Sequence, residues 1–506
     1  MPPMQRLPGD PNPTSKERKS AALPRGNTVM KAEWKIRSYT SEEIAQITGG
    51  ILVPGTAGSC PVTGICTDSR EVVPGMLFCA IAGERTDGHL YIDTACGAGA
   101  ACVLAQRAAE NCPVDTVVVP DTVHAIGELA GHYRDQSSIR VIAITGSVGK
   151  TTTKEFIAAV ASAGYRTHKT EGNHNNDLGL SMTLFTLSPE DQVSVLEMGM
   201  SNAGEIARLS ELAKPDVAVI TNIGTSHMES LGSRENICRA KLEIVTGMRE
   251  GGILLYNGDE PLLVDGASAA FSSLRSFSVD GRDGHYRAVN IRQTGDGMLY
   301  DLISGDNVLT NVRIPTLGRH NVYNSLAAYA VGDLLGLDED TIRRGLLAFH
   351  GADRRQKIYE IGDITVIDDC YNASPESMRA ALDVLTAVAA SKGQRATALL
   401  GDMLELGEYS RLMHDQVGQY AAEKRVSHLF CYGKMADVVA EAAIKHGIRA
   451  DNVCVSLDTK DPATMADMIL SAIQPGDVLL VKASRGVAAE NVIECLKSHF
   501  ERQEKK

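Results

Sequence analysis

This chain is organised around Thr145-Gly146-Ser147-Val148-Gly149-Lys150-Thr151-Thr152-Thr153-Lys154. An apolar run at 140–144 precedes these residues, and an apolar-periodic segment at 155–160 follows them. The order predicts a strand, a glycine-rich loop and a helix. Two glycines allow a tight turn, so successive N–H groups and the positive end of the helix dipole face one phosphate chain.

Lys150 and Thr151 stand at the positions that such a loop requires. The lysine reaches the terminal phosphates of a nucleotide, and the threonine hydroxyl ligates Mg²⁺. The full phosphate-loop pattern has a glycine where this chain has Ile144, so the match is to the shorter Gly-x-x-Gly-Lys-Thr form. We predict an ATP or GTP site built by Gly146, Ser147, Val148, Gly149, Lys150, Thr151 and Thr152.

Length and composition set further bounds. The chain has 506 residues, and at roughly 150 residues per domain it holds about three domains. Hydrophobic content of 43% and charged content of 22% are those of an ordinary globular protein. The formal net charge is −13, and no basic stripe with interleaved aromatic residues is present. Nucleic acid is therefore not an expected partner.

The cysteines and apolar segments indicate the compartment. The chain has 11 cysteines and no Cys-x-x-Cys pair, which is typical of reduced thiols in a cytoplasmic protein. No apolar run approaches the ~18 residues of a membrane span, and the N-terminus has no hydrophobic signal core. We expect a cytoplasmic protein without membrane insertion.

The pattern of segments predicts an α/β protein. Residues 1–29 form a polar tail that we expect to be disordered. Residues 30–138 are predicted to form a small α/β domain, and residues 139–350 a central ATP-binding domain with a parallel sheet. Residues 351–506 alternate strand and helix regularly, as in a Rossmann-like domain. They lack Gly-x-Gly-x-x-Gly, so a dinucleotide is not implied.

Three polar side chains follow strands of the predicted central sheet. They are Glu197, His227 and Asn257. The ligands of a parallel sheet bind beyond the carboxyl ends of its strands. These residues therefore share the edge that carries the phosphate loop, and we expect them in the site.

Several motifs resemble those of the Mur ligases of bacterial peptidoglycan synthesis. They are 146–152 (GSVGKTT), 197–200 (EMGM), 221–227 (TNIGTSH), 240–244 (AKLEI) and 318–321 (GRHN). Two more, 371–375 (YNASP) and 400–407 (LGDMLELG), resemble the member of the family that acts last. Together the motifs cover about residues 34–498 in the family's order.

The resemblance implies three domains: one for a UDP-sugar, a central ATPase and a C-terminal Rossmann-like ligase domain. It implies that D-alanyl-D-alanine is joined to UDP-N-acetylmuramoyl-tripeptide, in the pathway that governs cell-wall biogenesis, cell shape and cell division. The substrate carboxylate attacks the γ-phosphate of ATP to give an acyl phosphate, and the dipeptide amine then displaces phosphate. A monomer is expected.

The resemblance also implies roles for single residues. Lys150, His227 and Lys241 are the expected catalytic residues. The expected Mg²⁺ ligands are Thr151, Glu197, His227 and Lys241, the last as a carbamate. Asn321, Asn324, Arg355 and Asp369 are expected to bind ATP, with Arg354 as the alternative register for Arg355. The substrate-binding residues are expected to be Asp68, Ser69, Arg70, Asn175, Asn176, Asn372, Lys482 and Ser484.

Other readings remain open. The sibling ligase that adds a diamino acid is one, although its Asp-Asn-Pro-Arg motif is missing here. A folylpolyglutamate synthetase-type ligase is another. An ATP-dependent switch protein belongs to a different class, because phosphate loops occur on proteins of many functions. The sequence does not decide whether the third residue of the tripeptide is meso-diaminopimelate or lysine.

Overall fold

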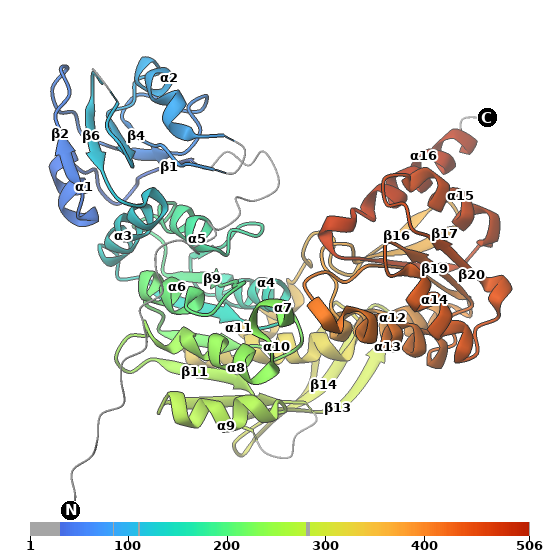
Figure 1. Ribbon diagram of the computed structural model, residues 1–506. Helices are drawn as coiled ribbons and strands as arrows, with labels where there is room; N and C mark the ends of the chain where they lie inside the picture. Colours follow the sequence, from blue (N-terminus) through green and yellow to red (C-terminus); the bar gives the residue numbers. More distant parts are fainter. Residues whose placement is uncertain (1–30, 84–85, 110–111, 280–283, 505–506) are drawn as a thin grey trace, which may run out of the picture. The chain divides into compact units, whose positions relative to one another are not determined.

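The computed structural model describes residues 31–83, 86–109, 112–279 and 284–504 (Figure 1). The tail at 1–29, predicted to be disordered, lies outside them. The chain divides into two compact units, the first ending at Leu129 and the second beginning at Ala130. This division falls inside helix α3 (Thr122–Asp135). The predicted boundaries at 138/139 and 350/351 stay predictions.

The first unit contains a mixed six-stranded sheet with helices α1 (Ser41–Thr48) and α2 (Ile92–Gly97). Its strands are β1 (Lys31–Glu33), β2 (Ile51–Val53), β3 (Gly64–Cys66), β4 (Met76–Cys79), β5 (Cys102–Ala105) and β6 (Asp115–Val118). They lie in the order β1-β3-β4-β5-β6-β2. The inner strands β3 to β6 are parallel and the two edge strands antiparallel. Parallel strands are apolar on both faces because both are covered.

The central domain is built on a nine-stranded sheet in the order β15-β14-β13-β12-β11-β10-β7-β9-β8. Strands β7 to β13 form the parallel part, and the hairpins of β13, β14 and β15 extend it antiparallel. The sequence analysis predicted the parallel part of this sheet. The strands are β7 (Arg140–Thr145), β8 (Thr167–Lys169), β9 (Val193–Glu197), β10 (Val217–Ile220), β11 (Ile253–Asn257), β12 (Leu274–Ser278), β13 (Tyr286–Thr294), β14 (Gly297–Ser304) and β15 (Asn307–Ile314).

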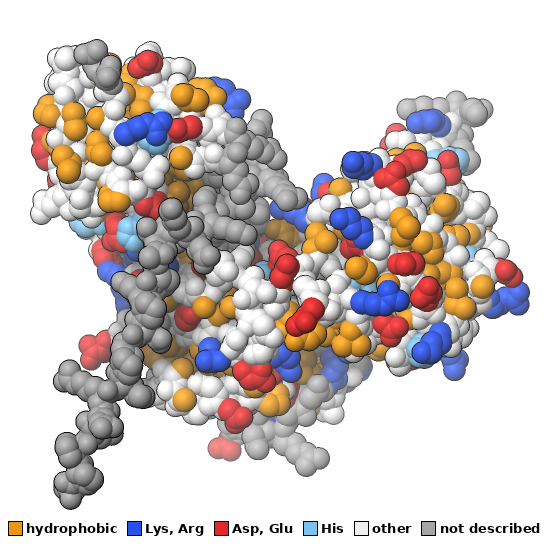
Figure 2. All heavy atoms as spheres, viewed as in Figure 1, with side chains coloured by type: hydrophobic (Ala, Val, Ile, Leu, Met, Phe, Trp, Pro, Cys, Tyr) orange, Lys and Arg blue, Asp and Glu red, His pale blue; other side chains and the backbone are white. Residues whose placement is uncertain are grey.

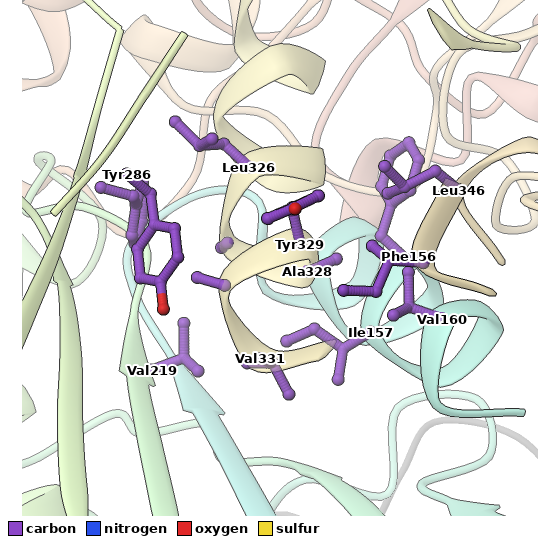
Figure 3. Packing of buried hydrophobic residues seen from close by; sticks show 14 of the residues in the cluster. Phe156, Ile157, Val160, Val219, Tyr286, Leu326, Ala328, Tyr329, Val331 and Leu346 are labelled. Carbon is purple, nitrogen blue, oxygen red and sulfur yellow. The ribbon is translucent and has the colours of Figure 1, made fainter. Parts of the chain in front are cut away.

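Helices of the central domain join these strands and bury their apolar faces on the sheet. They are α4 (Lys150–Ser162), α5 (Asp177–Leu184), α6 (Glu205–Ala213), α7 (Met228–Leu231), α8 (Arg234–Leu242), α9 (Pro261–Ala270), α10 (Arg319–Leu334) and α11 (Glu339–Leu347). Figure 3 shows Phe156 and Ile157 of α4 packed with Tyr329 and Val331 of α10. The rings of Phe156 and Phe349 stack with their centroids 3.6 Å apart. This core fixes α4, and with it the phosphate loop at the start of that helix.

The C-terminal domain is a six-stranded sheet in the order β16-β17-β21-β18-β19-β20. It is parallel except for the antiparallel edge strand β16. Its strands are β16 (Lys357–Ile361), β17 (Ile364–Asp368), β18 (Ala396–Gly401), β19 (His428–Tyr432), β20 (Val453–Ser456) and β21 (Val478–Lys482). Helices α12 (Pro375–Lys392), α13 (Ser410–Glu423), α14 (Ala436–Lys445), α15 (Pro462–Ala472) and α16 (Glu490–Glu504) cover the sheet (Figure 1). The predicted α/β class with parallel sheets is confirmed.

Within the described part of the chain, no helix is both long and apolar enough to cross a membrane. On the face shown in Figure 2, Lys and Arg side chains of the C-terminal domain are interspersed with Asp and Glu. Oppositely charged side chains mixed in this way give no large field of one sign.

Candidate active site

The phosphate loop joins β7 to α4, as predicted. Gly146 has φ +151° and Gly149 φ +86°, both outside the range that other residues favour. A Cβ atom on Gly146 would lie 1.9 Å from Thr221 Oγ1, and one on Gly149 would lie 2.8 Å from Asn324 Oδ1. Both glycines are therefore required by close approach as well as by conformation.

Residues just beyond β10, the strand next to β7, hold the loop in shape. Thr221 Oγ1 donates to the carbonyl of Val148 at 2.6 Å, and the side chain of Asn222 accepts from the Val148 N–H at 2.9 Å. Asn257, at the end of β11, donates to the carbonyl of Thr221 at 3.0 Å. The sequence placed Asn257 at this edge but assigned no role to Asn222, which lies within the motif at 221–227.

Lys150 begins α4, and its ammonium donates to the carbonyl of Gly146 at 2.7 Å. Burial lowers the pKa of Lys150; the carboxylate of Glu197 opposes that shift, and the charge of Arg355 adds to it. Ser147 Oγ is buried and has no hydrogen-bond partner among the described residues. The loop thus holds one cation and one hydroxyl that an anion would satisfy.

Glu197 ends β9 and is 2% exposed. Asn175 Nδ2 donates to its Oε1 at 2.8 Å, whereas Oε2 is buried without a partner among the described residues. Lys154 supports the same region: its ammonium donates to the carbonyl of Thr170 at 2.7 Å, and Thr170 Oγ1 accepts from the Glu197 N–H at 3.0 Å. Glu197 therefore has one oxygen fixed and one oxygen unused.

His227 lies in the loop between β10 and α7, with φ +65°. Its Nδ1 is 2.9 Å from Oε2 of Glu405, a residue of the C-terminal domain. The Glu405 side chain is 61% exposed. Its contact with His227, together with the charge of Lys150, lowers the pKa of Glu405. The sequence quoted Glu405 within the motif at 400–407 but gave it no role.

Lys241 lies in α8 and is 1% exposed. Burial lowers its pKa well below 10.5, and the charge of Lys150 lowers it further. Within the described residues, no carboxylate pairs with its ammonium and no hydrogen bond holds it. A charged ammonium in that position is costly, because nothing replaces its hydration.

Asn321 and Asn324 lie in the first two turns of α10. Asn321 Nδ2 donates to the carbonyl of Leu317 at 2.8 Å, and Asn324 Nδ2 donates to Asn321 Oδ1 at 3.0 Å. Asn324 Oδ1 in turn accepts from Thr153 of α4 at 3.0 Å. The two amides therefore brace α10 against the phosphate loop.

Arg354 and Arg355 contact different partners. Arg354 forms an ion pair with Glu490 at 2.5 Å. Arg355 lies over the ring of Tyr371, with its guanidinium carbon 4.2 Å from the ring centroid, and Arg485 approaches the same ring at 5.5 Å. The charge of Arg355 also lowers the pKa of Lys150, which favours Arg355 over Arg354 for the predicted ATP contact; the assignment stays a prediction.

The remaining predicted residues of the C-terminal domain lie beside β17 and β21. Lys482 Nζ contacts Asp369 Oδ2 at 2.6 Å and the carbonyl of Asn372 at 3.0 Å. Ser484 Oγ donates to the carbonyl of Ala373 at 3.4 Å and accepts from the Leu404 N–H at 3.0 Å. Lys482 thus joins Asp369 and Asn372, whereas Ser484 bonds to residues outside the predicted set.

The predicted substrate-binding residues Asn176 and Asp68 form hydrogen bonds to residues close to them in the sequence. Asn176 caps α5 by accepting from the Gly179 N–H at 2.8 Å. In the first unit, Asp68 accepts from the Arg70 side chain at 2.5 Å and from its N–H at 3.0 Å. The hydrogen bond from Arg70 is the main cause that lowers the pKa of Asp68. Ser69, which stands between Asp68 and Arg70 in the sequence, is buried.

These features define a nucleotide-binding α/β protein with a phosphate loop. The comparisons with known proteins are more specific. The Mur ligase middle domain matches residues 144–332, the "Mur ligase, glutamate ligase domain" matches 353–485, and the "Mur ligase family, catalytic domain" matches 61–134. Three successive matches confirm the predicted order of three domains.

Single proteins agree with the family models. The chain is 39% identical over 460 residues to the UDP-N-acetylmuramoyl-tripeptide–D-alanyl-D-alanine ligase of Bacillus subtilis, covering 90% of this chain and 98% of that protein. A crystal structure of MurF from Acinetobacter baumannii superposes with a TM-score of 0.82 at 32% identity, covering 91% and 99%. MurF from Thermotoga maritima in complex with ADP gives 0.77 at 28% identity, covering 87% and 98%. The chain belongs to the Mur ligase family.

Proposed function

We infer that the protein is an ATP-dependent, ADP-forming peptide ligase that joins D-alanyl-D-alanine to UDP-N-acetylmuramoyl-tripeptide. The product is the UDP-linked pentapeptide of peptidoglycan synthesis. The observation that carries this inference is the 39% identity to the Bacillus subtilis enzyme of that name over 90% of the chain. The motifs at 371–375 and 400–407 had already favoured this member over the sibling that adds a diamino acid.

The phosphate loop supplies the first chemical requirement. Carboxylate and triphosphate are both anionic, so attack of one on the other is opposed by charge repulsion. Phosphoryl transfer is catalysed mainly by positioning and electrostatic stabilisation. We propose that Lys150 leaves the Gly146 carbonyl to contact the terminal phosphates and that the Ser147 hydroxyl donates its hydrogen bond to a phosphate oxygen. Arg355 is proposed to approach from the C-terminal domain.

Mg²⁺ fits the residues at this edge. Glu197 presents one buried carboxylate oxygen without a partner among the described residues, and Thr151 is buried in the first turn of α4. Oxygen donors of this kind suit a hard cation. Within the described part of the chain, no three His, Cys, Asp or Glu side chains gather into a metal site of their own. This agrees with Mg²⁺, which is usually held by one or two protein groups together with substrate phosphates.

We propose that Thr151 and Glu197 hold one Mg²⁺ and that His227 and Lys241 hold a second. When bound, Mg²⁺ would neutralise charge on the transferring phosphate. Lys241 is proposed to act as a carbamate, whose negative oxygens attract a cation that an ammonium would repel. What supports this is the burial of Lys241 without an acidic partner in the described residues, beside the cation Lys150.

The remaining predicted site residues are assigned to parts of the ligands. Asn321 and Asn324 are proposed for the adenine side of ATP, and Asp369 and Asn372 for the part of the C-terminal domain that closes over the nucleotide. Lys482 and Ser484 are proposed to bind substrate there. Asn175 and Asn176 are proposed for the peptide, and Asp68, Ser69 and Arg70 for the uridine. We further propose a cytoplasmic monomer.

A coupled assay of ADP release with omission of single substrates tests the function. The ligase requires ATP, UDP-N-acetylmuramoyl-tripeptide and D-alanyl-D-alanine together for turnover. Release of ADP without the dipeptide would instead indicate an ATP-dependent switch. Turnover with a diamino acid or glutamate in place of the dipeptide would indicate the sibling or the folylpolyglutamate synthetase-type reaction. Tripeptides ending in meso-diaminopimelate or lysine, compared directly, give the preferred third residue.

A further inference from the structure

Two carboxylates of the C-terminal domain hold the loop that carries His227. Glu376, in the first turn of α12, accepts from the N–H and the Oγ1 of Thr225, each at 3.0 Å. Glu405 lies 2.9 Å from His227 Nδ1. The carbonyl of Glu405 also accepts from the Glu229 N–H at 3.4 Å. The loop is therefore bonded on both sides of His227 by residues more than a hundred positions away.

The backbone at this contact is unusual on both sides. His227 has φ +65° and Glu405 has φ +63°. Residues with a Cβ rarely adopt the left-handed region, and they persist there when surrounding contacts hold them. Such strain is common at functional sites. Here both strained residues direct their side chains at one another.

The carboxylate of Glu405, 2.9 Å from Nδ1, bears on which nitrogen of His227 is available. In a neutral imidazole one ring nitrogen carries a proton and the other has a free lone pair. A carboxylate at Nδ1 favours the proton on that nitrogen, which leaves the lone pair on Nε2. Histidines that ligate metals commonly donate their other N–H to a carboxylate in this way, and the contact fixes both tautomer and ring orientation.

We propose that Glu405 is a positioning residue for His227, so that the C-terminal domain sets the ring that ligates the second divalent cation. This inference rests on the proposed metal role of His227. It makes cation binding and docking of the C-terminal domain on this loop reciprocal: each strengthens the other by the same factor. The second cation is then held tightly only when the residues that act on the nucleotide from the C-terminal domain are in place.

The test measures binding of Mn²⁺ to the full-length protein by electron paramagnetic resonance, with a non-hydrolysable ATP analogue and UDP-N-acetylmuramoyl-tripeptide present. Glu405→Gln removes the charge, and Glu405→Gly removes the side chain while relieving the left-handed backbone. Both are expected to weaken one Mn²⁺ site by roughly ten- to a hundredfold and to leave the other unchanged. The matched control is Glu408→Gln, an exposed glutamate three residues along, which should bind as the wild type does.

Thermal unfolding separates positioning from a structural role. Glu405→Gly should not lower the unfolding midpoint, because glycine adopts positive φ freely. A merely structural Glu405 would show the reverse pattern, a lower midpoint with normal Mn²⁺ affinity, and that result would overturn the proposal. Tighter Mn²⁺ binding in Glu405→Gln would also overturn it, since Glu405 would then compete with the cation.

His227→Ala distinguishes this proposal from the one on which it rests. If His227→Ala weakens a Mn²⁺ site and neither Glu405 variant does, His227 ligates the cation without help from Glu405. If His227→Ala leaves both Mn²⁺ sites unchanged, the metal role of His227 is wrong, and the positioning role is wrong with it. Loss of the same site in His227→Ala and in both Glu405 variants is the expected result.

Discussion

At the carboxyl edge of the central sheet, Ser147 Oγ and Glu197 Oε2 are buried without a partner among the described residues. At the same edge of the C-terminal sheet, Lys482 and Ser484 are buried and bonded to neighbouring loops. Both edges follow parallel strands, and both carry residues assigned to the site. A buried polar group without a partner costs free energy. The central edge therefore bears a cost that a ligand would remove, whereas the C-terminal edge already satisfies its own groups.

This difference separates two kinds of residue. Substitution of a buried group whose partner is a ligand should reduce activity. It should leave stability unchanged or improved, as is common for active sites. Substitution of a group bonded to its neighbours should reduce stability. Lys150 and Lys241 belong to the first kind and Lys482 to the second.

Lys150→Ala has the largest expected effect. The triphosphate loses its cation at the point of transfer, so turnover should fall by roughly a thousandfold or more. The unfolding midpoint should not fall, because Lys150 bonds only to the Gly146 carbonyl at 2.7 Å among the contacts described. ADP release and thermal unfolding are measured beside Lys460→Ala, an exposed lysine. A variant that keeps most of its kcat would show that this loop is not the catalytic phosphate site.

Lys241→Ala is expected to reduce kcat by about a hundredfold. If Lys241 works as a carbamate, acetate or formate should restore part of the rate by supplying the missing oxygens. If it contacts phosphate as an ammonium, the rate falls and carboxylic acids do nothing. The matched control is Arg239→Ala, an exposed cation on the same helix, expected within about 0.5 kcal/mol of wild type. A near-normal rate for Lys241→Ala would exclude both roles.

The two edges also differ in how far the sequence predicted them. The phosphate loop was predicted because strand, glycines, lysine and helix are contiguous, so local geometry alone sets the site. The alternation of strands and helices at 351–506 was predicted because strands such as β17 are buried apolar runs. The edge strands β15 and β16 were not predicted, since most of their side chains are exposed and the apolar pattern is weak.

The contacts of Glu376 and Glu405 illustrate what single motifs do not contain. Glu376 and Thr225 are 151 positions apart, and their hydrogen bond exists only because two domains meet. Both glutamates lie in or beside motifs that the sequence analysis quoted. The motifs therefore indicated where these residues are, but not which residues they contact. Tyr371 was likewise quoted in a motif, but the arginines over its ring become visible only in the fold.

Lys482→Met should lower stability more than it changes the chemistry. Lys482 is 3% exposed in its side chain and pairs with Asp369 at 2.6 Å. Breaking a buried pair leaves one charge uncompensated, which costs about 3 kcal/mol, and the unfolding midpoint of the C-terminal domain should fall by roughly 6–12 °C. Adding Asp369→Asn should recover part of the loss, because the orphaned charge is removed. Equal midpoints for Lys482→Met and Lys150→Met would contradict the contrast between the two edges.

Glu376→Gln has the smallest expected effect. Its carboxylate accepts twice from Thr225, through the N–H and the hydroxyl, and an amide oxygen accepts more weakly than a carboxylate. A loss of about 1 kcal/mol would reduce the fraction of molecules with the C-terminal domain docked on this loop. Because apparent affinity scales with that fraction, KM for the dipeptide should rise by roughly fivefold while kcat stays unchanged. Thr225→Val removes the hydroxyl partner, so the double variant should be little worse than Glu376→Gln alone. Strictly additive effects would mean that the working enzyme does not make this contact, and the reciprocal link between docking and the His227 loop would lose one of its two supports.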